Sequence, residues 1–174
     1  MIECLEDPDM TLKSKTLDLL VRMTNKKNVE AIVEKLMENL KQIPSDSKVK
    51  KELVANIHNL VDKYSPNKTW FVRTMNKLFI AGGDLVTSDI SNKFIKVVSK
   101  KVDKTQFKDS TVKIYKNLLK KNQTMSDSHM KTIVWILGEY LSSGEPSPNF
   151  EKEHEILNLL CQSVLERTFE EETT

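Results

Sequence analysis

Apolar residues recur every three to four positions along most of the chain, the spacing that places them on one face of an α-helix. The stretch from 28 to 42 follows this spacing without a miss, at Val29, Ile32, Val33, Leu36, Met37 and Leu40. The pattern predicts an all-α protein.

Prolines, glycines and polar clusters divide the pattern into eight expected helices. Asp7-Pro8-Asp9 introduces the first helix, and Pro44-Ser45-Asp46 is expected to cap the third. Asp109 is expected to cap the sixth after a lysine-rich connection, residues 100–108. The eight helices are expected to bury, in order, Leu12, Thr16, Leu19, Leu20 and Met23; the set within 28–42; Val49, Leu53, Ile57, Leu60, Val61 and Tyr64; Trp70, Phe71, Thr74, Met75, Leu78 and Phe79; Ile90, Phe94, Ile95, Val97 and Val98; Val112, Tyr115, Leu118 and Leu119; Met130, Ile133, Val134, Leu137, Tyr140 and Leu141; and Leu157, Leu160, Cys161, Val164 and Leu165.

The fourth helix has the widest apolar arc of the chain. Pro66 precedes it and Gly82-Gly83 follow it, so both of its ends are marked. Adjacent Trp70 and Phe71 give it more apolar surface than one neighbouring helix can cover. We therefore expect this helix to lie in the middle of a stack, with Trp70 as a core residue.

The eight helices form four successive pairs. The pairs begin near Thr11, Asp46, Ser88 and Ser126, at spacings of 35, 42 and 38 residues. A period near 40 with helical hairpins is typical of an α-solenoid of HEAT or armadillo type. We expect residues 1–168 to form one helical-repeat domain and residues 169–174 a disordered acidic tail. A compact helical bundle is the alternative.

Composition agrees with helices and excludes several protein classes. Of 174 residues, 39% are apolar and 30% charged, with only four glycines. No apolar run reaches the roughly 18 residues that a membrane span needs, and no leader peptide opens the chain, so a soluble, non-secreted protein is expected. Cys4 and Cys161 are too far apart in sequence to suggest a metal site or a disulfide framework.

Positive charge gathers in the middle of the chain. Between Lys41 and Lys131 there are 19 Lys or Arg against 8 Asp or Glu, while the whole chain carries +2. The densest cluster is a candidate contact for an anionic surface, and it comprises Lys93, Lys96, Lys100, Lys101 and Lys104. A solvated helix face explains the same lysines. Nucleic-acid binding is a further alternative, although 24 lysines against 3 arginines disfavour bidentate contacts.

Residue patterns for catalysis, metals or cofactors are lacking. His58, His129 and His154 lie on different expected helices, and no serine or cysteine lies in a glycine-rich turn. We expect no cofactor and no enzymatic activity.

Short motifs, in contrast, resemble one known family. The family resemblance is carried by Leu17–Asn25 (LDLLVRMTN), Tyr64-Ser65-Pro66, Trp70–Asn76 (WFVRTMN), Ala81–Asp84 (AGGD), Asp89–Phe94 (DISNKF) and Trp135–Tyr140 (WILGEY). In this order they resemble the trunk of the large adaptin subunits of clathrin-type adaptor complexes, and most of all the epsilon subunits of adaptor protein complex 4. Ser91 departs from the family, which often has proline there. A gamma-type adaptin is the alternative within the family.

The resemblance implies a fragment of a helical trunk that acts as a non-catalytic scaffold. Such trunks are α-solenoids that assemble with beta, mu and sigma subunits, and a small GTPase recruits the complex to trans-Golgi or endosomal membranes, where it sorts cargo tails. In the family, the contacts for recruitment and for dileucine signals lie mostly near the beginning of the trunk, so the resemblance carries no binding residue over to this stretch. The motif residues expected to serve helix packing are Trp70, Gly82, Gly83, Trp135, Gly138 and Tyr140. A nucleic-acid-binding or transport-receptor scaffold is the alternative function.

Overall fold

The computed structural model describes residues 9–44, 47–99, 105–121, 125–142 and 150–172. Within these ranges the chain forms eight α-helices, one 3-10 helix and no strand. The helices are α1 (Met10–Met23), α2 (Val29–Gln42), α3 (Lys48–Tyr64), α4 (Lys68–Gly82), η2 (Gly83–Leu85), α5 (Ser88–Ser99), α6 (Thr105–Lys120), α7 (Asp127–Ser142) and α8 (Phe150–Glu172). The predicted all-α class is confirmed.

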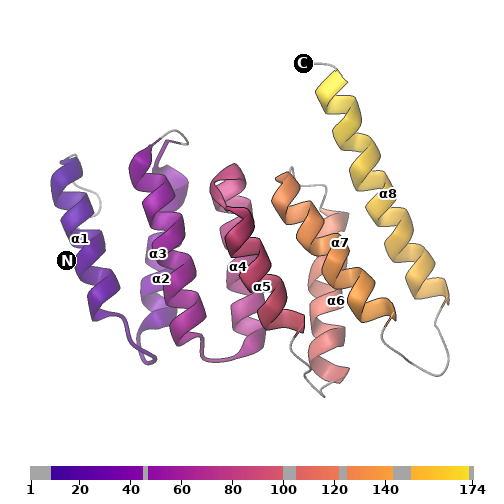
Figure 1. Ribbon diagram of the computed structural model, residues 1–174, viewed down its shortest axis with the longest axis horizontal. Helices are drawn as coiled ribbons and strands as arrows, with labels where there is room; N and C mark the ends of the chain where they lie inside the picture. The colour runs from indigo at the N-terminus through magenta and orange to yellow at the C-terminus, as the bar shows by residue number, and fades with distance from the viewer. Residues whose placement is uncertain (1–8, 45–46, 100–104, 122–124, 143–149, 173–174) are drawn as a thin grey trace.

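The helices stand side by side in a row that is two layers deep (Figure 1). Helices α2, α4, α6 and α8 follow one another in one layer, while α1 contacts α3 and α5 contacts α7 in the other. Helix α1 lies at one end of the row and α8 at the other. This arrangement is the predicted α-solenoid and not a compact bundle.

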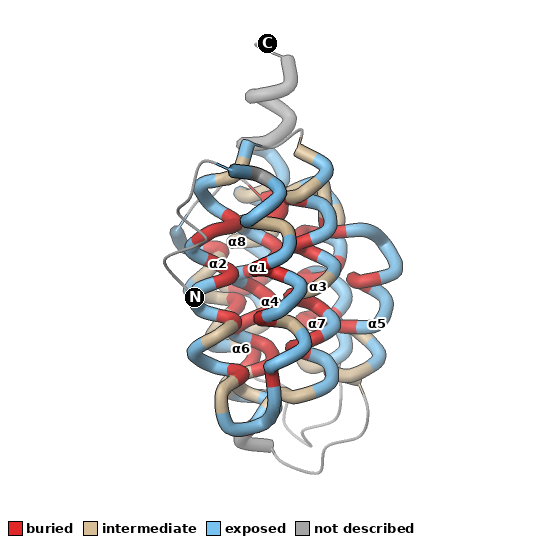
Figure 2. Tube along the Cα trace, turned by 90° about the vertical axis from the view of Figure 1, so that its left-hand side faces the viewer, coloured by how far each residue is buried: buried red, intermediate tan, exposed pale blue. Residues whose placement is uncertain are grey.

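A continuous apolar core runs between the two layers. Seen from the α1 end, buried residues lie between the layers and exposed residues lie on the outer faces (Figure 2). The largest buried side chains come from six helices, and they include Leu36, Leu40, Ile57, Met75, Phe79, Phe94, Tyr115, Leu119, Ile133 and Ile136. Each hairpin therefore covers the apolar faces of its neighbours, which is the main source of stability in such stacks.

Polar side chains cap α1, α3 and α4, whereas the N-cap residue of α2, Asn28, makes no side-chain capping hydrogen bond. Asp9 Oδ1 accepts a hydrogen bond from the Thr11 N–H at 2.8 Å, and Asn67 Oδ1 accepts one from the Trp70 N–H at 2.8 Å. The third cap differs from the prediction. Ser47 is the N-cap of α3, since its Oγ accepts from the Val49 N–H, whereas Ser45 and Asp46 lie outside the described residues.

Helix α6 begins earlier than the sequence predicts, and Asp109 is not its cap. The helix starts at Thr105, so Asp109 lies inside it on the solvent side. Phe107 explains the longer helix, because its ring is buried and lies 5.9 Å from the Lys68 ammonium. The turn that begins at Thr105 carries Phe107 in this contact.

Helix α8 is also longer than expected. It continues to Glu172, so residues 169–172 are helical and not part of a disordered tail; residues 173–174 lie outside the described ranges.

Some apolar residues expected to be buried are exposed, and they lie towards the two ends of the row. These residues are Leu12, Leu19 and Met23 of α1, Val134 of α7 and Leu157, Val164, Leu165 and Cys161 of α8. An end helix has a neighbouring repeat on one side only, so part of its apolar stripe stays uncovered. Among residues 153–165 of α8, Ile156 is the buried side chain, and the sequence pattern did not single it out.

Candidate functional site

A cluster of rings joins three helices at the centre of the stack. Phe94 of α5 lies with its ring centroid 5.6 Å from that of Phe71 and 5.7 Å from that of Phe79, both on α4. On the other side Phe79 stacks on the imidazole of His129, from α7, at 4.7 Å. Aromatic pairs at these distances attract one another beyond the effect of their burial. The ring cluster therefore fixes the position of α5 and α7 relative to α4.

A buried polar group continues from the ring cluster towards α6. His129 Nε2 lies 3.2 Å from Asn76 Oδ1, and the fully buried hydroxyl of Tyr115 lies beside Asn76. Burial lowers the pKa of His129 to about 4 and raises that of Tyr115, so both groups are neutral at pH 7. We refer to Asn76, Tyr115 and His129 as the polar triad. It brings together uncharged polar groups from α4, α6 and α7; within the described part of the chain, Asn76 Nδ2, His129 Nδ1 and the Tyr115 hydroxyl have no hydrogen-bond partner.

Gly82 and Gly83 end α4 by two different means. A Cβ on Gly82 would lie 2.9 Å from Val86 Cγ2 and 3.2 Å from Val54 Cγ2, so the site has no space for a side chain. Gly83 has φ of +52° and ψ of −128°, a conformation that glycine adopts with little strain. Its N–H donates to the Phe79 carbonyl, which closes the helix. The two glycines thus bring η2 against α3 and α4.

Gly138 differs from this pair. It is exposed on α7, and a Cβ there would meet nothing within 4 Å. The motif suggests that Gly138 allows close packing of helices, but no described residue packs against it in this way.

We expect alanine at these two helical glycines to have opposite effects. Gly82→Ala should lower the free energy of unfolding by about 1–3 kcal/mol, because the methyl group overlaps two valine side chains. Gly138→Ala should raise it by about 0.5–1 kcal/mol, because alanine stabilises an exposed helix interior. Urea unfolding of both variants measures the two changes, and a stabilised Gly82→Ala would contradict the packing described here.

The two tryptophans are less buried than a packing role predicts. Trp70 is half-buried at the edge of the core, and Trp135 is 41% exposed on α7. Tyr140, five residues after Trp135 in the motif, is also half-buried, but its hydroxyl donates to the Val98 carbonyl at 2.8 Å and ties α7 to α5.

Because Trp70 is not a core residue, its truncation should be moderately costly. Trp70→Ala is expected to lower the free energy of unfolding by about 1–2 kcal/mol, below the ~3–5 kcal/mol typical of fully buried aromatic residues. Chemical unfolding provides the measurement, with Trp70→Phe as the conservative comparison. A loss as large as that of a core aromatic would show that the ring is fully covered in solution.

The candidate lysines divide into two groups. Lys93 and Lys96 are exposed on α5. Lys100, Lys101 and Lys104 lie outside the described residues, so the structure does not show whether the five come together.

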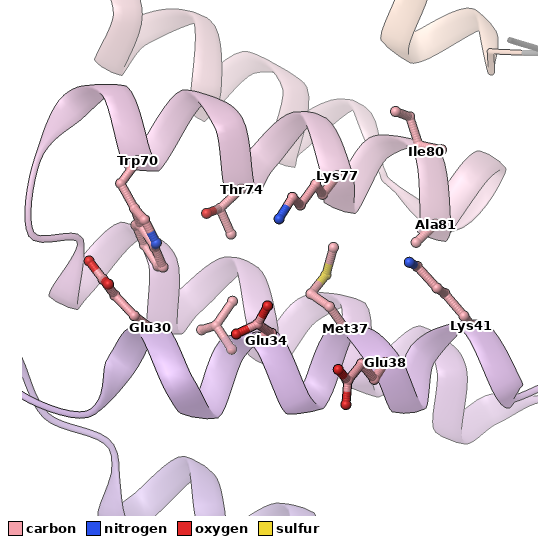
Figure 3. A pocket seen from close by; sticks show the side chains of 11 residues that line it. Glu30, Glu34, Met37, Glu38, Lys41, Trp70, Thr74, Lys77, Ile80 and Ala81 are labelled. Atoms are coloured by element: carbon pink, nitrogen blue, oxygen red, sulfur yellow. The ribbon is translucent and has the colours of Figure 1, made fainter.

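A groove lies between α2 and α4 on the outer side of their layer (Figure 3). Its volume is about 620 Å³. Apolar and small side chains, Val33, Met37, Thr74 and Ala81, line it together with Trp70 and Ile80, and charged residues from both helices border it. No sequence motif pointed to this groove, because it is formed by residues about 40 positions apart.

Across the described ranges, no three His, Cys, Asp or Glu side chains gather as metal ligands would. Within the same residues, none of the helices combines the length and apolarity needed to cross a bilayer.

Comparison with known proteins assigns the family. The sequence profile described as "Adaptin N terminal region" matches residues 1–174. The chain is 37% identical to human "AP-4 complex subunit epsilon-1", over 80% of this chain and 13% of that protein. It is 33% identical to the Arabidopsis thaliana "AP-4 complex subunit epsilon", over 80% of this chain and 15% of the relative, and 30% identical to Arabidopsis "AP-1 complex subunit gamma-1", over the same shares.

The chain thus spans less than a fifth of the length of these relatives. The sequence match, the eight-helix stack and the adaptin-like motifs agree. The chain belongs to the adaptin family, as a segment of the N-terminal helical region of a large adaptor-complex subunit similar to the AP-4 epsilon subunits.

Proposed function

We propose that this chain is a non-catalytic scaffold segment of an adaptor-complex large subunit, working in vesicle-mediated protein sorting. The observation that carries the proposal is the unbroken core between two helical layers in a member of the adaptin family. A stack with such a core holds its outer surfaces in fixed positions. Rigid outer surfaces suit a subunit that positions other polypeptides.

The partners in this proposal are the beta, mu and sigma subunits of a heterotetrameric complex. The names of the most similar relatives favour adaptor complex 4, and a gamma-type large subunit is the alternative. A small GTPase and cargo tails would act through the assembled complex at trans-Golgi or endosomal membranes.

Co-purification of the full-length protein that carries this segment tests the proposal. We expect the beta, mu and sigma subunits to co-purify with it in equal amounts. Phe94→Asp, which places a carboxylate inside the ring cluster, should abolish this assembly, whereas Asn92→Asp, at an exposed position on the same helix, should not. Recovery of RNA in a salt-dependent manner, without the three subunits, would instead support a nucleic-acid-binding scaffold.

We further propose that Lys93 and Lys96 contact anionic lipid when the complex is on a membrane. Their exposure on α5 and the excess of lysine in the middle of the chain support this. Sedimentation with vesicles containing phosphatidylserine should decrease in the Lys93→Glu/Lys96→Glu variant. The matched control is Lys26→Glu/Lys27→Glu in the α1–α2 turn, and equal loss in both would reject a specific role for α5.

A further inference from the structure

The groove between α2 and α4 combines an apolar floor with an uneven distribution of charge. Val33, Met37 and Ala81 contribute to the floor, and Ile80 leaves 40% of its surface exposed. Val33 and Met37 are themselves buried, so the exposed apolar surface of the groove comes from Ile80 and from the partly exposed Trp70 and Ala81. An apolar hollow of this kind is suited to side chains of another polypeptide.

Acidic residues line the α2 side of the groove. Glu30, Glu34 and Glu38 follow one another at four-residue intervals, which places them about 6 Å apart along the helix. Glu38 pairs with Lys35 at 2.8 Å. Among the described residues no ion pair is formed by Glu30 or Glu34, so their carboxylates are available to a partner.

Trp70 lies at the acidic end. Figure 3 shows its indole reaching from α4 towards α2, with Glu30 and Glu34 on the facing helix. A half-buried indole beside two carboxylates matches the chemistry of a guanidinium or ammonium group, which stacks on the ring and donates to the carboxylates. Arginine suits both interactions, because its planar group can stack and form two parallel hydrogen bonds.

Basic residues lie in the middle and at the far end of the groove. Lys41 of α2 lies near Ala81, at the end far from Trp70 and beyond Glu38, whereas Lys77 of α4 lies midway along the groove, between Thr74 and Met37 (Figure 3). Near Trp70 a ligand therefore meets Glu30 and Glu34, which form no ion pair among the described residues, and it meets lysines further along. This uneven distribution favours basic residues of the ligand at the Trp70 end.

We propose that the groove binds an amphipathic helical segment of another protein, with aliphatic side chains in the groove and arginine or lysine against Glu30, Glu34 and Trp70. The four-residue spacing of the glutamates matches basic residues one turn apart on such a helix. An acidic residue of the segment would lie near Lys41, at the far end of the groove. The proposal does not depend on which adaptor complex contains the chain.

A peptide titration tests the proposal directly. The Trp135→Phe variant leaves Trp70 as the single tryptophan, so its fluorescence reports on the groove. The probe is an 18-residue helical peptide with a leucine stripe, arginines at one end and glutamates at the other. We expect saturable binding that weakens at high salt, and a peptide with glutamate in place of every arginine should not bind.

Paired variants then identify the site. Glu30→Gln/Glu34→Gln should weaken peptide binding about tenfold, equivalent to about 1.4 kcal/mol. Glu52→Gln, at an exposed position on α3, should leave binding unchanged. Equal affinity of the Glu30→Gln/Glu34→Gln variant and the parent, or equal binding of the all-glutamate peptide, would overturn the proposal.

Self-association is distinguished in the same experiment. A change in Trp70 fluorescence with protein concentration, in the absence of peptide, would show that a second copy of this chain fills the groove and would refute the proposed ligand. Peptide binding can succeed even if co-purification with the adaptor subunits fails, so the two proposals are tested separately.

Discussion

Replacing Phe94 with alanine is expected to lower the free energy of unfolding by about 3–5 kcal/mol, among the largest losses that a single substitution causes. Phe94 is completely buried and contacts the rings of Phe71 and Phe79. Its removal leaves a cavity where α4 meets α5, at the centre of the row. Urea unfolding followed by circular dichroism measures the loss.

Leu157→Ala is the control for Phe94→Ala. Leu157 is 57% exposed on α8, so its truncation should change the free energy of unfolding by less than about 0.5 kcal/mol. Similar losses for the two variants would mean that the ring cluster does not hold the stack together.

Acidification is expected to destabilise the protein through His129. Its pKa is about 4 in the folded chain, because the imidazole is buried, and about 6.5 when unfolded. Between these values the unfolded state binds the proton and the folded state does not, so stability falls as pH decreases from 6.5 to 4. The loss from this residue amounts to about 3 kcal/mol, since each pKa unit corresponds to ~1.36 kcal/mol.

The neutral variant His129→Gln isolates this effect. Burial also lowers the pKa of His58, and Lys116 and Lys120 lower that of Glu155, so the parent protein has other pH-dependent groups. The informative quantity is therefore the difference between parent and variant in unfolding free energy at pH 7 and pH 4.5. An identical pH dependence of the two proteins would show that His129 is not buried as a neutral group.

Local pattern was sufficient to predict most of the fold. The periodic apolar positions of α2 gave its core face, since Val29, Val33, Leu36 and Leu40 are all buried. The ends of the helices were also predicted closely, as Asn28 illustrates. Its side chain bonds to Asn25 and Met23, so this polar stretch of the sequence forms a turn in the structure. These features depend on contacts within a few residues.

Features that depend on distant neighbours could not be predicted in this way. His129 was treated only as a possible metal ligand, but its four-residue spacing to Ile133 on a buried face was a sign of its burial. Asn76 lies 53 residues away, so no local pattern could reveal their hydrogen bond. Gly138 and Trp135 belong to a family motif, yet the described neighbours leave both of them exposed.

The groove between α2 and α4 was even harder to predict from the sequence. The sequence did not single out the glutamates of α2, and Trp70 suggested only a core residue. Packing α2 beside α4 brings the two features into one groove. A stack of helices creates its surfaces between repeats, where single-helix patterns carry little information.

The central claim is that all four hairpins form one rigid unit, and the two tryptophans allow a direct test. Trp70 reports on α4, and Trp135 reports on α7. In each single-tryptophan variant, Trp70→Phe and Trp135→Phe, we predict that fluorescence and circular dichroism give the same urea midpoint, as a single cooperative transition requires. Separate midpoints for fluorescence and circular dichroism in either variant would show that the hairpins unfold independently, and would contradict the rigid scaffold proposed here.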